Sequence, residues 1–225
     1  MDKISMFETL LKLPLFQGAS IDRMAHAVGS VKFDFLRFVP DTPIINPGDE
    51  CTKLSFVLGG TVRLTVSAPN HELEVSQTLT GPDVIMPDFL FGMNTRYPYS
   101  VTTTSAVSIL RIEKADYMTI LTLDPVFLIN ALNYLSAGAQ KPIADILPMI
   151  DSTFEKRIAF IVRMLTQSTA TDIVIRCSDE HYEKVFGLNF TDARPILDKL
   201  TSAGLITYTP NTITIPNRKH FLQHL

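Results

Sequence analysis

The spacing of hydrophobic residues changes along the chain, and each change predicts a different kind of element. Over residues 6–29 the apolar positions recur at helical intervals, with Ser20 as a candidate N-cap, so we expect two short helices. From Val31 to about Ile112, short stretches rich in Val, Ile, Thr and Phe alternate with turns that contain Pro and Gly. This alternation is typical of an all-β sandwich or barrel, so we expect a β-roll there.

The clearest strand pair of this region surrounds the turn Gly59-Gly60. Residues 54–58 and 61–66 have the composition of strands on either side of that turn. Their alternation predicts one face in the core and the other in water. The predicted core face carries Val62, Leu64 and Val66.

After Ile112 the pattern becomes helical. Asp124 followed by Pro125 is typical of an N-cap and a first helical residue. Pro142 and Pro148 predict that this helix kinks near the first proline and stops before the second. The helix carries an apolar stripe that a monomer would not fully cover, so we expect a homodimer interface formed by Phe127, Leu128, Ala131, Leu132 and Leu135.

A second, helical domain is expected from about residue 151. Ser152 and Glu155 have the spacing of a capping box ahead of an amphipathic helix. Farther along, Ser178 can cap a helix over residues 179–186, and Gly187 can supply a left-handed turn after it. The domain therefore begins with one helix and continues with a second that ends in a tight turn.

The residues after that turn complete a recognisable unit. Asn189 or Thr191 can cap another helix that ends at Gly204, and residues 205–215 have the pattern of a small hairpin. A helix–turn–helix followed by a hairpin is a winged helix, which predicts DNA binding. A winged helix that binds another protein is the alternative.

Composition and charge restrict the function further. The chain has 225 residues, 46% hydrophobic and 19% charged, with a net charge of −3, so it is expected to fold and is not a polybasic nucleic-acid binder. Residues 1–150 carry 11 basic and 15 acidic side chains, whereas residues 151–225 carry 9 and 8, which makes the second region the better DNA partner. The chain shows no signal peptide and no long apolar run, so we expect a soluble cytoplasmic protein that does not enter a membrane.

In its order of motifs the chain resembles the Crp/Fnr family of bacterial transcription regulators. The matching segments are LPLFQG (13–18), IINPGD (44–49), FVLGGTVRL (56–64), EKRIA (155–159) and LTSAGLI (200–206). The resemblance implies an α+β fold in three parts: a double-stranded β-helix (jelly-roll) effector domain at 1–118, a connecting dimerisation helix at 119–150 and a winged helix-turn-helix domain at 151–225. It also implies a homodimer on a two-fold symmetric operator in double-stranded DNA, with RNA polymerase as a further candidate partner.

The segment that would bind a cyclic nucleotide departs from the family pattern. Met86 falls on the position of the glutamate that accepts from the ribose hydroxyl, and Tyr99 falls on that of the arginine that pairs with the phosphate. Without that charged partner a bound phosphodiester would lose several kcal/mol, so cyclic AMP is not expected to bind and no cofactor is predicted. The alternatives are substitution by Arg96, a changed pocket for an unidentified effector, or no ligand; the candidate pocket residues are Met86, Asp88, Phe89, Arg96, Tyr99 and Ser100.

The predicted DNA-reading helix also departs from the family. Phe190, Thr191 and Pro195 stand where well-studied members carry arginine, glutamate and arginine, so a different base preference is expected. The proline predicts that the helix either starts late or bends at its reading end. The remaining candidates for DNA contact are Asn189, Thr191, Arg194 and Lys199, with Arg218 and Lys219 on phosphates. A degenerate winged helix that binds a protein stays the alternative.

Other chemistry is not supported by the sequence. Cys51 and Cys177 have no spaced partners for a disulfide, zinc or an iron–sulfur cluster, and His220 and His224 are the only histidines with helical spacing suited to a shared metal. No phosphate-binding loop, nucleophile elbow or metalloprotease motif is present, so the chain is not expected to be an enzyme.

Overall fold

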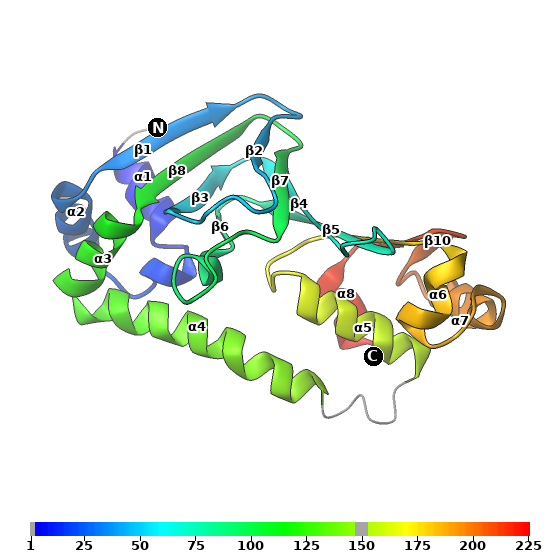
Figure 1. Cartoon of the computed structure of the whole chain (residues 1–225). Helices are drawn as coiled ribbons and strands as arrows, with labels where there is room; N and C mark the ends of the chain where they lie inside the picture. The colour runs from blue at the N-terminus through cyan, green and yellow to red at the C-terminus, as the bar shows by residue number, and fades with distance from the viewer. Residues whose placement is uncertain (1–2, 147–152) are drawn as a thin grey trace. The chain divides into compact units, whose positions relative to one another are not determined.

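The computed structural model describes residues 3–146 and 153–225 (Figure 1) and divides into two compact units. The first unit consists of Met1–Val62, Thr80–Pro98 and Thr102–Lys141. The second consists of Arg63–Leu79, Tyr99–Val101 and Pro142–Leu225. The second unit thus includes a hairpin and a strand segment from the region predicted as the β-roll, besides the C-terminal residues.

Two helices of the first unit, α2 (Ile21–Ser30) and α4 (Pro125–Ile146), begin where the local signals predicted. The unit also contains α1 (Lys3–Leu10), the 3-10 turn η1 (Pro14–Phe16) and α3 (Lys114–Leu123). The hydroxyl of Ser20 accepts from the Arg23 amide at 3.3 Å, and the Asp124 carboxylate accepts from the Val126 amide at 2.9 Å, so both predicted N-caps are confirmed. Helix α4 continues past Pro142 as far as Ile146, and its predicted end before Pro148 lies outside the described residues.

A four-stranded antiparallel sheet forms the centre of the first unit. Its order is β1-β8-β3-β6, with β1 (Phe33–Phe38), β8 (Val107–Glu113), β3 (Lys53–Gly59) and β6 (Asp83–Ile85). Phe56 of β3 is fully buried under Phe16, which in turn contacts Phe127 of α4, with ring centroids 5.4 and 5.9 Å apart. Such aromatic contacts fix η1 and α4 on this sheet.

The predicted hairpin around Gly59-Gly60 is wrong. Strand β3 belongs to the four-stranded sheet, whereas β4 (Thr61–Ser67) belongs to the other sheet, so the chain changes sheets at this turn. Gly60 has a φ of +88°, and a Cβ there would lie 2.2 Å from the Ala106 carbonyl oxygen. Glycine is required at this position because both the backbone angle and the close approach exclude a side chain.

Six neighbouring strands of a seven-stranded sheet follow in the order β10-β11-β9-β5-β4-β7, of which Figure 1 labels β4, β5, β7 and β10. Besides β4, these strands are β5 (Leu73–Thr80), β7 (Tyr99–Thr103), β9 (Ile173–Cys177), β10 (Thr207–Thr209) and β11 (Thr212–Ile215). Strands β5 and β9 pair antiparallel over five residues, from Leu73 opposite Cys177 to Gln77 opposite Ile173. The remaining short elements, in the first unit, are β2 (Pro43–Ile45) and η2 (Pro87–Phe89).

The helices of the second unit are α5 (Phe154–Leu165), α6 (Asp179–Phe186), α7 (Phe190–Ser202) and α8 (Arg218–Gln223). The cap of α5 is Thr153, which accepts from the Lys156 amide at 3.5 Å; the predicted cap Ser152 lies outside the described residues. Among the described residues no single helix is long and apolar enough to span a membrane.

The turn between α6 and α7 follows the prediction closely. Gly187 is left-handed with a φ of +77°, and the Asn189 side chain caps α7 by accepting from the Asp192 amide at 2.9 Å. Helix α7 begins at Phe190 and contains Pro195, so the first of the two alternatives, a helix that starts late, is wrong.

Candidate functional site

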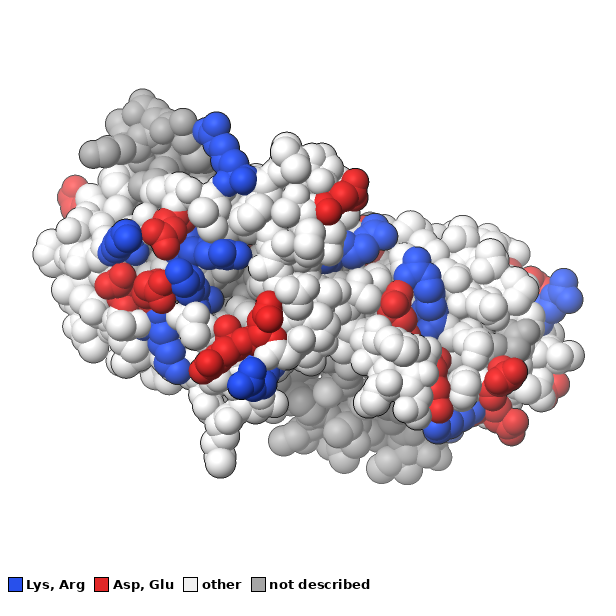
Figure 2. Space-filling view, turned by 45° about the horizontal axis from the view of Figure 1, so that its top comes forward, with Lys and Arg blue, Asp and Glu red and all other residues white. Residues whose placement is uncertain are grey.

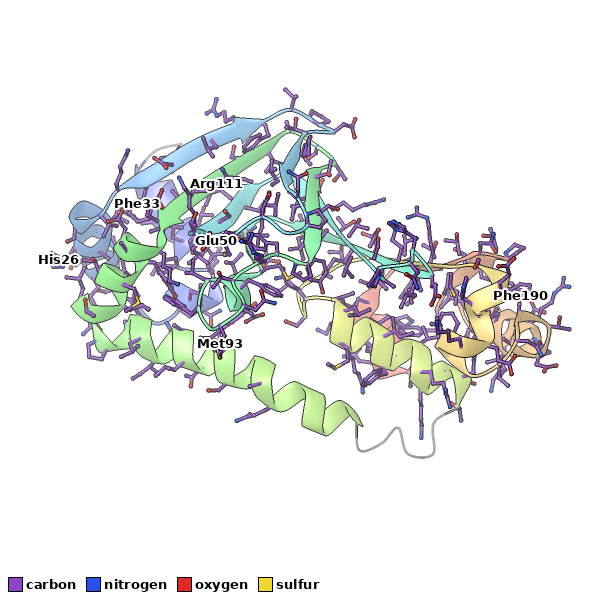
Figure 3. All side chains as sticks on the ribbon, viewed as in Figure 1. His26, Phe33, Glu50, Met93, Arg111 and Phe190 are labelled. Atoms are coloured by element: carbon purple, nitrogen blue, oxygen red, sulfur yellow. The ribbon has the colours of Figure 1, made fainter. Side chains whose placement is uncertain are left out.

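An aromatic cluster holds the helix pair α6–α7 together. Tyr182 and Phe186 of α6 have ring centroids 4.6 Å apart, and Phe190 makes edge contacts with Tyr182 at 5.4 Å and with Tyr208 of β10 at 6.2 Å. Phe190, labelled in Figure 3, therefore packs between the helix pair and the hairpin β10–β11. It occupies the position of a base-reading arginine in the resembled family, but its role here is structural.

The candidate DNA-contacting residues of α7 lie on its exposed side. Thr191, Arg194 and Lys199 are exposed, and Asn189 is exposed while it caps the helix. The Tyr208 hydroxyl donates to the Asp198 carboxylate at 2.5 Å, which raises the pKa of Tyr208, and a hydrogen bond with Arg194 acts in the opposite direction.

Arg218 does not have the position that was predicted for it. Its side chain is only 6% exposed, and its Nε donates to the Thr166 hydroxyl at 2.9 Å while Nη1 donates to the Ser168 carbonyl at 3.3 Å. A guanidinium buried in this way is not available to a phosphate, so the prediction that Arg218 contacts DNA is corrected. Lys219 beside it is exposed.

The predicted effector residues have different surroundings. Met86 is buried with a left-handed φ of +41°, whereas Arg96 is exposed and donates to the Gly48 carbonyl at 2.8 Å. Tyr99 donates to the Leu165 carbonyl at 3.0 Å, and the Ser100 hydroxyl lies 3.5 Å from the Thr65 carbonyl. Asp88 is exposed and Phe89 is half-buried; these two residues, like Met86 and Arg96, belong to the first unit, and Tyr99 and Ser100 belong to the second.

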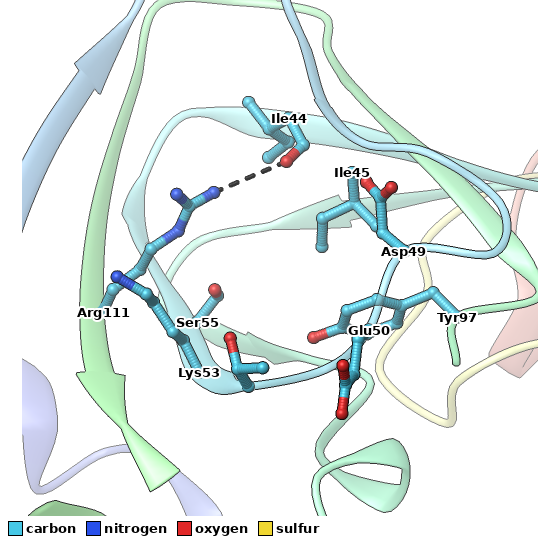
Figure 4. Close-up of a pocket in the computed structure, with 9 residues that line it drawn as sticks. Ile44, Ile45, Asp49, Glu50, Lys53, Ser55, Tyr97 and Arg111 are labelled. Atoms are coloured by element: carbon cyan, nitrogen blue, oxygen red, sulfur yellow. Dashed lines mark hydrogen bonds between the residues drawn. The ribbon is translucent and has the colours of Figure 1, made fainter. Parts of the chain in front are cut away.

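The first unit contains a cavity of about 180 Å³ that the sequence did not predict (Figure 4). It is lined by Ile44, Ile45, Asp49, Glu50, Thr52, Lys53, Ser55, Tyr97 and Arg111. Arg111 donates to the Ile44 carbonyl at 3.5 Å, Lys53 pairs with Glu113 at 2.6 Å, and Asp49 accepts from the Asn46 amide at 2.8 Å. Basic and acidic groups therefore line the cavity together, and three of its four charged groups already have a partner.

Tyr97 at this cavity contacts the thiol of Cys51, with 2.8 Å between oxygen and sulfur. Burial raises the pKa of Cys51 and that of Tyr97. Cys51 is thus a buried thiol that lies two residues before β3 and outside any strand, and its raised pKa does not favour the reactive thiolate form.

Helix α4 exposes only part of the predicted dimer stripe. Phe127 and Ala131 are buried in the first unit, at 1% and 7% exposure, so they are not available to a second copy and the prediction is corrected for them. Leu128 and Leu132 are exposed, Leu135 is half-buried, and Ile129, which was not predicted, is 54% exposed. Exposed leucines four residues apart form one apolar stripe on the helix surface.

Charged side chains and possible metal ligands do not form a separate site on the described surface. On the face drawn in Figure 2, basic side chains lie among acidic ones rather than in a separate patch. Within the described residues no group of three or more His, Cys, Asp or Glu side chains could hold a metal ion. The rings of His220 and His224 are tilted by 58° to each other, with their centroids 4.3 Å apart.

Known proteins match the chain in one region by sequence and over its length by fold. Residues 35–124 match the family "Cyclic nucleotide-binding domain", and no curated protein matches in sequence. The catabolite activator protein of Thermus thermophilus is similar in structure, with a TM-score of 0.53, 17% identity, and coverage of 94% of this chain and 99% of that one.

Two further structures cover a smaller share of this chain. The sensor domain of the transcriptional regulator DNR from Pseudomonas aeruginosa has a TM-score of 0.54 and 14% identity, and covers 64% of this chain and 95% of its own. A transcriptional regulator from Thermotoga maritima has a TM-score of 0.50 and 17% identity, with 57% and 98% coverage. Residues 35–124 are therefore similar to cyclic nucleotide-binding domains, and the chain shares its mixed α and β fold with the Thermus thermophilus catabolite activator protein.

Proposed function

We propose that this chain is a homodimeric, sequence-specific DNA-binding transcription regulator of the Crp/Fnr type. The observation that carries the proposal is the order of elements α6, the left-handed Gly187 turn, α7 and the hairpin β10–β11. This order of elements is that of a winged helix. The exposed side of α7 carries Thr191, Arg194 and Lys199, side chains that bind bases and phosphates. The domain limits 1–118, 119–150 and 151–225 remain part of the proposal.

The effector of this regulator is proposed to be something other than a cyclic nucleotide. Met86 cannot accept from a ribose hydroxyl, Tyr99 carries no charge for a phosphate, and Arg96 is held by the Gly48 carbonyl on the surface. The match to the cyclic nucleotide-binding family supports a β-roll of that fold, whereas the residues at positions 86, 96 and 99 argue against a cyclic nucleotide as its ligand.

A specific observation favours one alternative, a winged helix that binds protein. Asp192 and Asp198 lie on the exposed side of α7 and would repel phosphates, although Asp198 accepts from Tyr208. In that case the same face of α7 would recognise a polar protein surface instead of a major groove.

Selection from fragmented genomic DNA tests the proposal. Full-length protein is incubated with the fragments at about 0.1 M salt, and bound DNA is sequenced. We expect enrichment of two-fold symmetric sites whose half-sites are about one helical turn apart. Binding that is equal for all fragments, or absent, would contradict sequence-specific recognition and favour the protein-binding alternative.

A further inference from the structure

One face of β4, β5 and β7 in the second unit is covered by the chain itself. Tyr99 of β7 donates to the Leu165 carbonyl at 3.0 Å, and the Gln77 side chain of β5 accepts from the Gln167 amide at 2.7 Å. The Thr65 hydroxyl pairs with the Ser76 hydroxyl at 2.9 Å, which places the neighbouring Gln77 on the opposite side of the strand. Residues 165–167 therefore lie against β5 and β7, on the side of β5 that carries Gln77.

The residues that follow continue along the same strand. The Thr171 amide donates to the Thr78 carbonyl at 3.0 Å, and the Thr78 amide donates to the Asp172 carbonyl at 3.2 Å. We call residues 165–172 the strap. From its other side the strap is held by buried Arg218, which donates to Thr166, Ser168 and, through its backbone, to Thr171 at 2.9 Å.

Beyond the strap, the hairpin β4–β5 is joined to the predicted winged helix. Strand β5 pairs with β9, and Arg176 of β9 forms an ion pair with Glu74. Lys184 of α6 lies 2.6 Å from the Glu72 carboxylate, and His181 lies 3.4 Å from it. The helix that precedes the candidate reading helix is therefore fastened to the same hairpin as the strap.

We propose that the strap is an internal competitor for the effector face of the β-roll. Tyr99, which stands where the resembled family binds phosphate, is used by the strap's own carbonyl group, and Gln77 by its amide. A ligand that bonds with Tyr99 and Gln77 must displace the strap. Displacement removes one of the connections between the hairpin and the winged-helix region, while the β5–β9 pairing and the ion pairs of Glu72 and Glu74 remain. The effect of this displacement on DNA binding rests on the proposed function. The competition between the strap and a ligand does not rest on it.

The contacts also restrict what can displace the strap. The strap offers a carbonyl acceptor to Tyr99 and an N–H donor to Gln77, so a competitor that replaces these contacts must offer the same two kinds of group. Gln77 is 1% exposed, and its Nε2 has no hydrogen-bond partner among the described residues. A neutral, amide-like molecule with a second acceptor would satisfy that donor as well, which the strap does not do.

Amide hydrogen exchange on the full chain, without DNA, tests whether Tyr99 and Gln77 hold the strap in place. Tyr99→Phe and Gln77→Met each remove one of the two contacts, so the Gln167 and Thr171 amides should exchange about fivefold faster in each variant and about thirtyfold faster in the double variant. Tyr97→Phe is the matched control, because it deletes a buried hydroxyl bonded to Cys51 instead. Thr65→Val is the control on the opposite face of the hairpin.

The outcomes separate the strap from the proposed function. The strap amides could instead exchange equally fast in Tyr99→Phe and Tyr97→Phe while the β3 and β8 amides stay protected. That result would show that the Tyr99 contact does not hold the strap in place, and it would overturn the proposal. If the strap loosens as expected, the double variant should change the Kd for a selected DNA site at least threefold, and an unchanged Kd overturns its regulatory role. DNA binding that is absent from wild type and variants alike overturns the proposed function alone, since the exchange result does not depend on it.

Discussion

At the scale of single residues, Arg194 is the side chain of α7 best suited to read a base pair. It is exposed in the first turns of the helix, next to Pro195, and a guanidinium can make two parallel hydrogen bonds to guanine. Arg194→Ala should cost about 1–3 kcal/mol on the cognate operator and relax the preference at one base pair in each half-site.

Lys219 is expected to act differently, because an exposed lysine after the hairpin contacts phosphates. Lys219→Ala should weaken binding to all sequences alike and lower the salt slope by about one unit. Fluorescence anisotropy over a salt series compares both variants. Equal, sequence-independent losses would make Arg194 a phosphate contact, and no loss from either would favour the protein-binding alternative.

Arg218 should affect stability instead of DNA affinity. Its buried guanidinium supports Thr166 and Ser168, so Arg218→Ala is expected to lower the free energy of unfolding by about 2–4 kcal/mol. Lys219→Ala, one residue later and exposed, should change it by less than about 0.5 kcal/mol. Urea denaturation measures both, and similar small effects would contradict a structural role for Arg218.

At the scale of elements, the crossing between β3 and β4 depends on one glycine. Gly60→Ala should lower the free energy of unfolding by at least about 2 kcal/mol, because the new Cβ meets the Ala106 carbonyl at a left-handed φ. Gly59→Ala is the matched control, since a Cβ there has no atom within 4 Å. Chemical denaturation should show a large loss only for Gly60→Ala.

Helix α4 is the element on which the proposed dimer depends. Light scattering should give twice 25.1 kDa for the wild type, and Leu132→Asp, at a position that is 54% exposed, should give a monomer that is still folded. Phe127→Leu should reduce stability without changing the mass, because Phe127 packs on Phe16. A monomeric wild type at micromolar concentration, with no effect of Leu132→Asp, would rule out this interface.

At the scale of the whole molecule, the cyclic nucleotide-binding family match raises the question of cyclic AMP. Calorimetry with millimolar nucleotide should be flat, because neither Met86 nor Tyr99 supplies the polar or charged contact that this ligand needs. Micromolar affinity would mean that Arg96 and Asp88 have taken over these roles, which would require Arg96 to leave the Gly48 carbonyl.

The sequence by itself determined the elements whose signals are local. The caps Ser20, Asp124 and Asn189 act on amides two or three residues away, and Gly187 needs only its own backbone angle. Such contacts form wherever the local segment folds, so they can be read directly from the residue order. The helix pair and its hairpin, and with them the candidate DNA surface, followed from these signals.

Only the tertiary structure decided how distant residues are used. Tyr99 meets Leu165, Arg218 meets Thr166, and Phe127 meets Phe16, pairs that lie far apart along the chain. Hydrophobic periodicity placed Phe127 and Leu132 on one stripe, although one packs in the core and the other faces out. Burial is a property of what another segment covers, and no pattern within one segment contains that information.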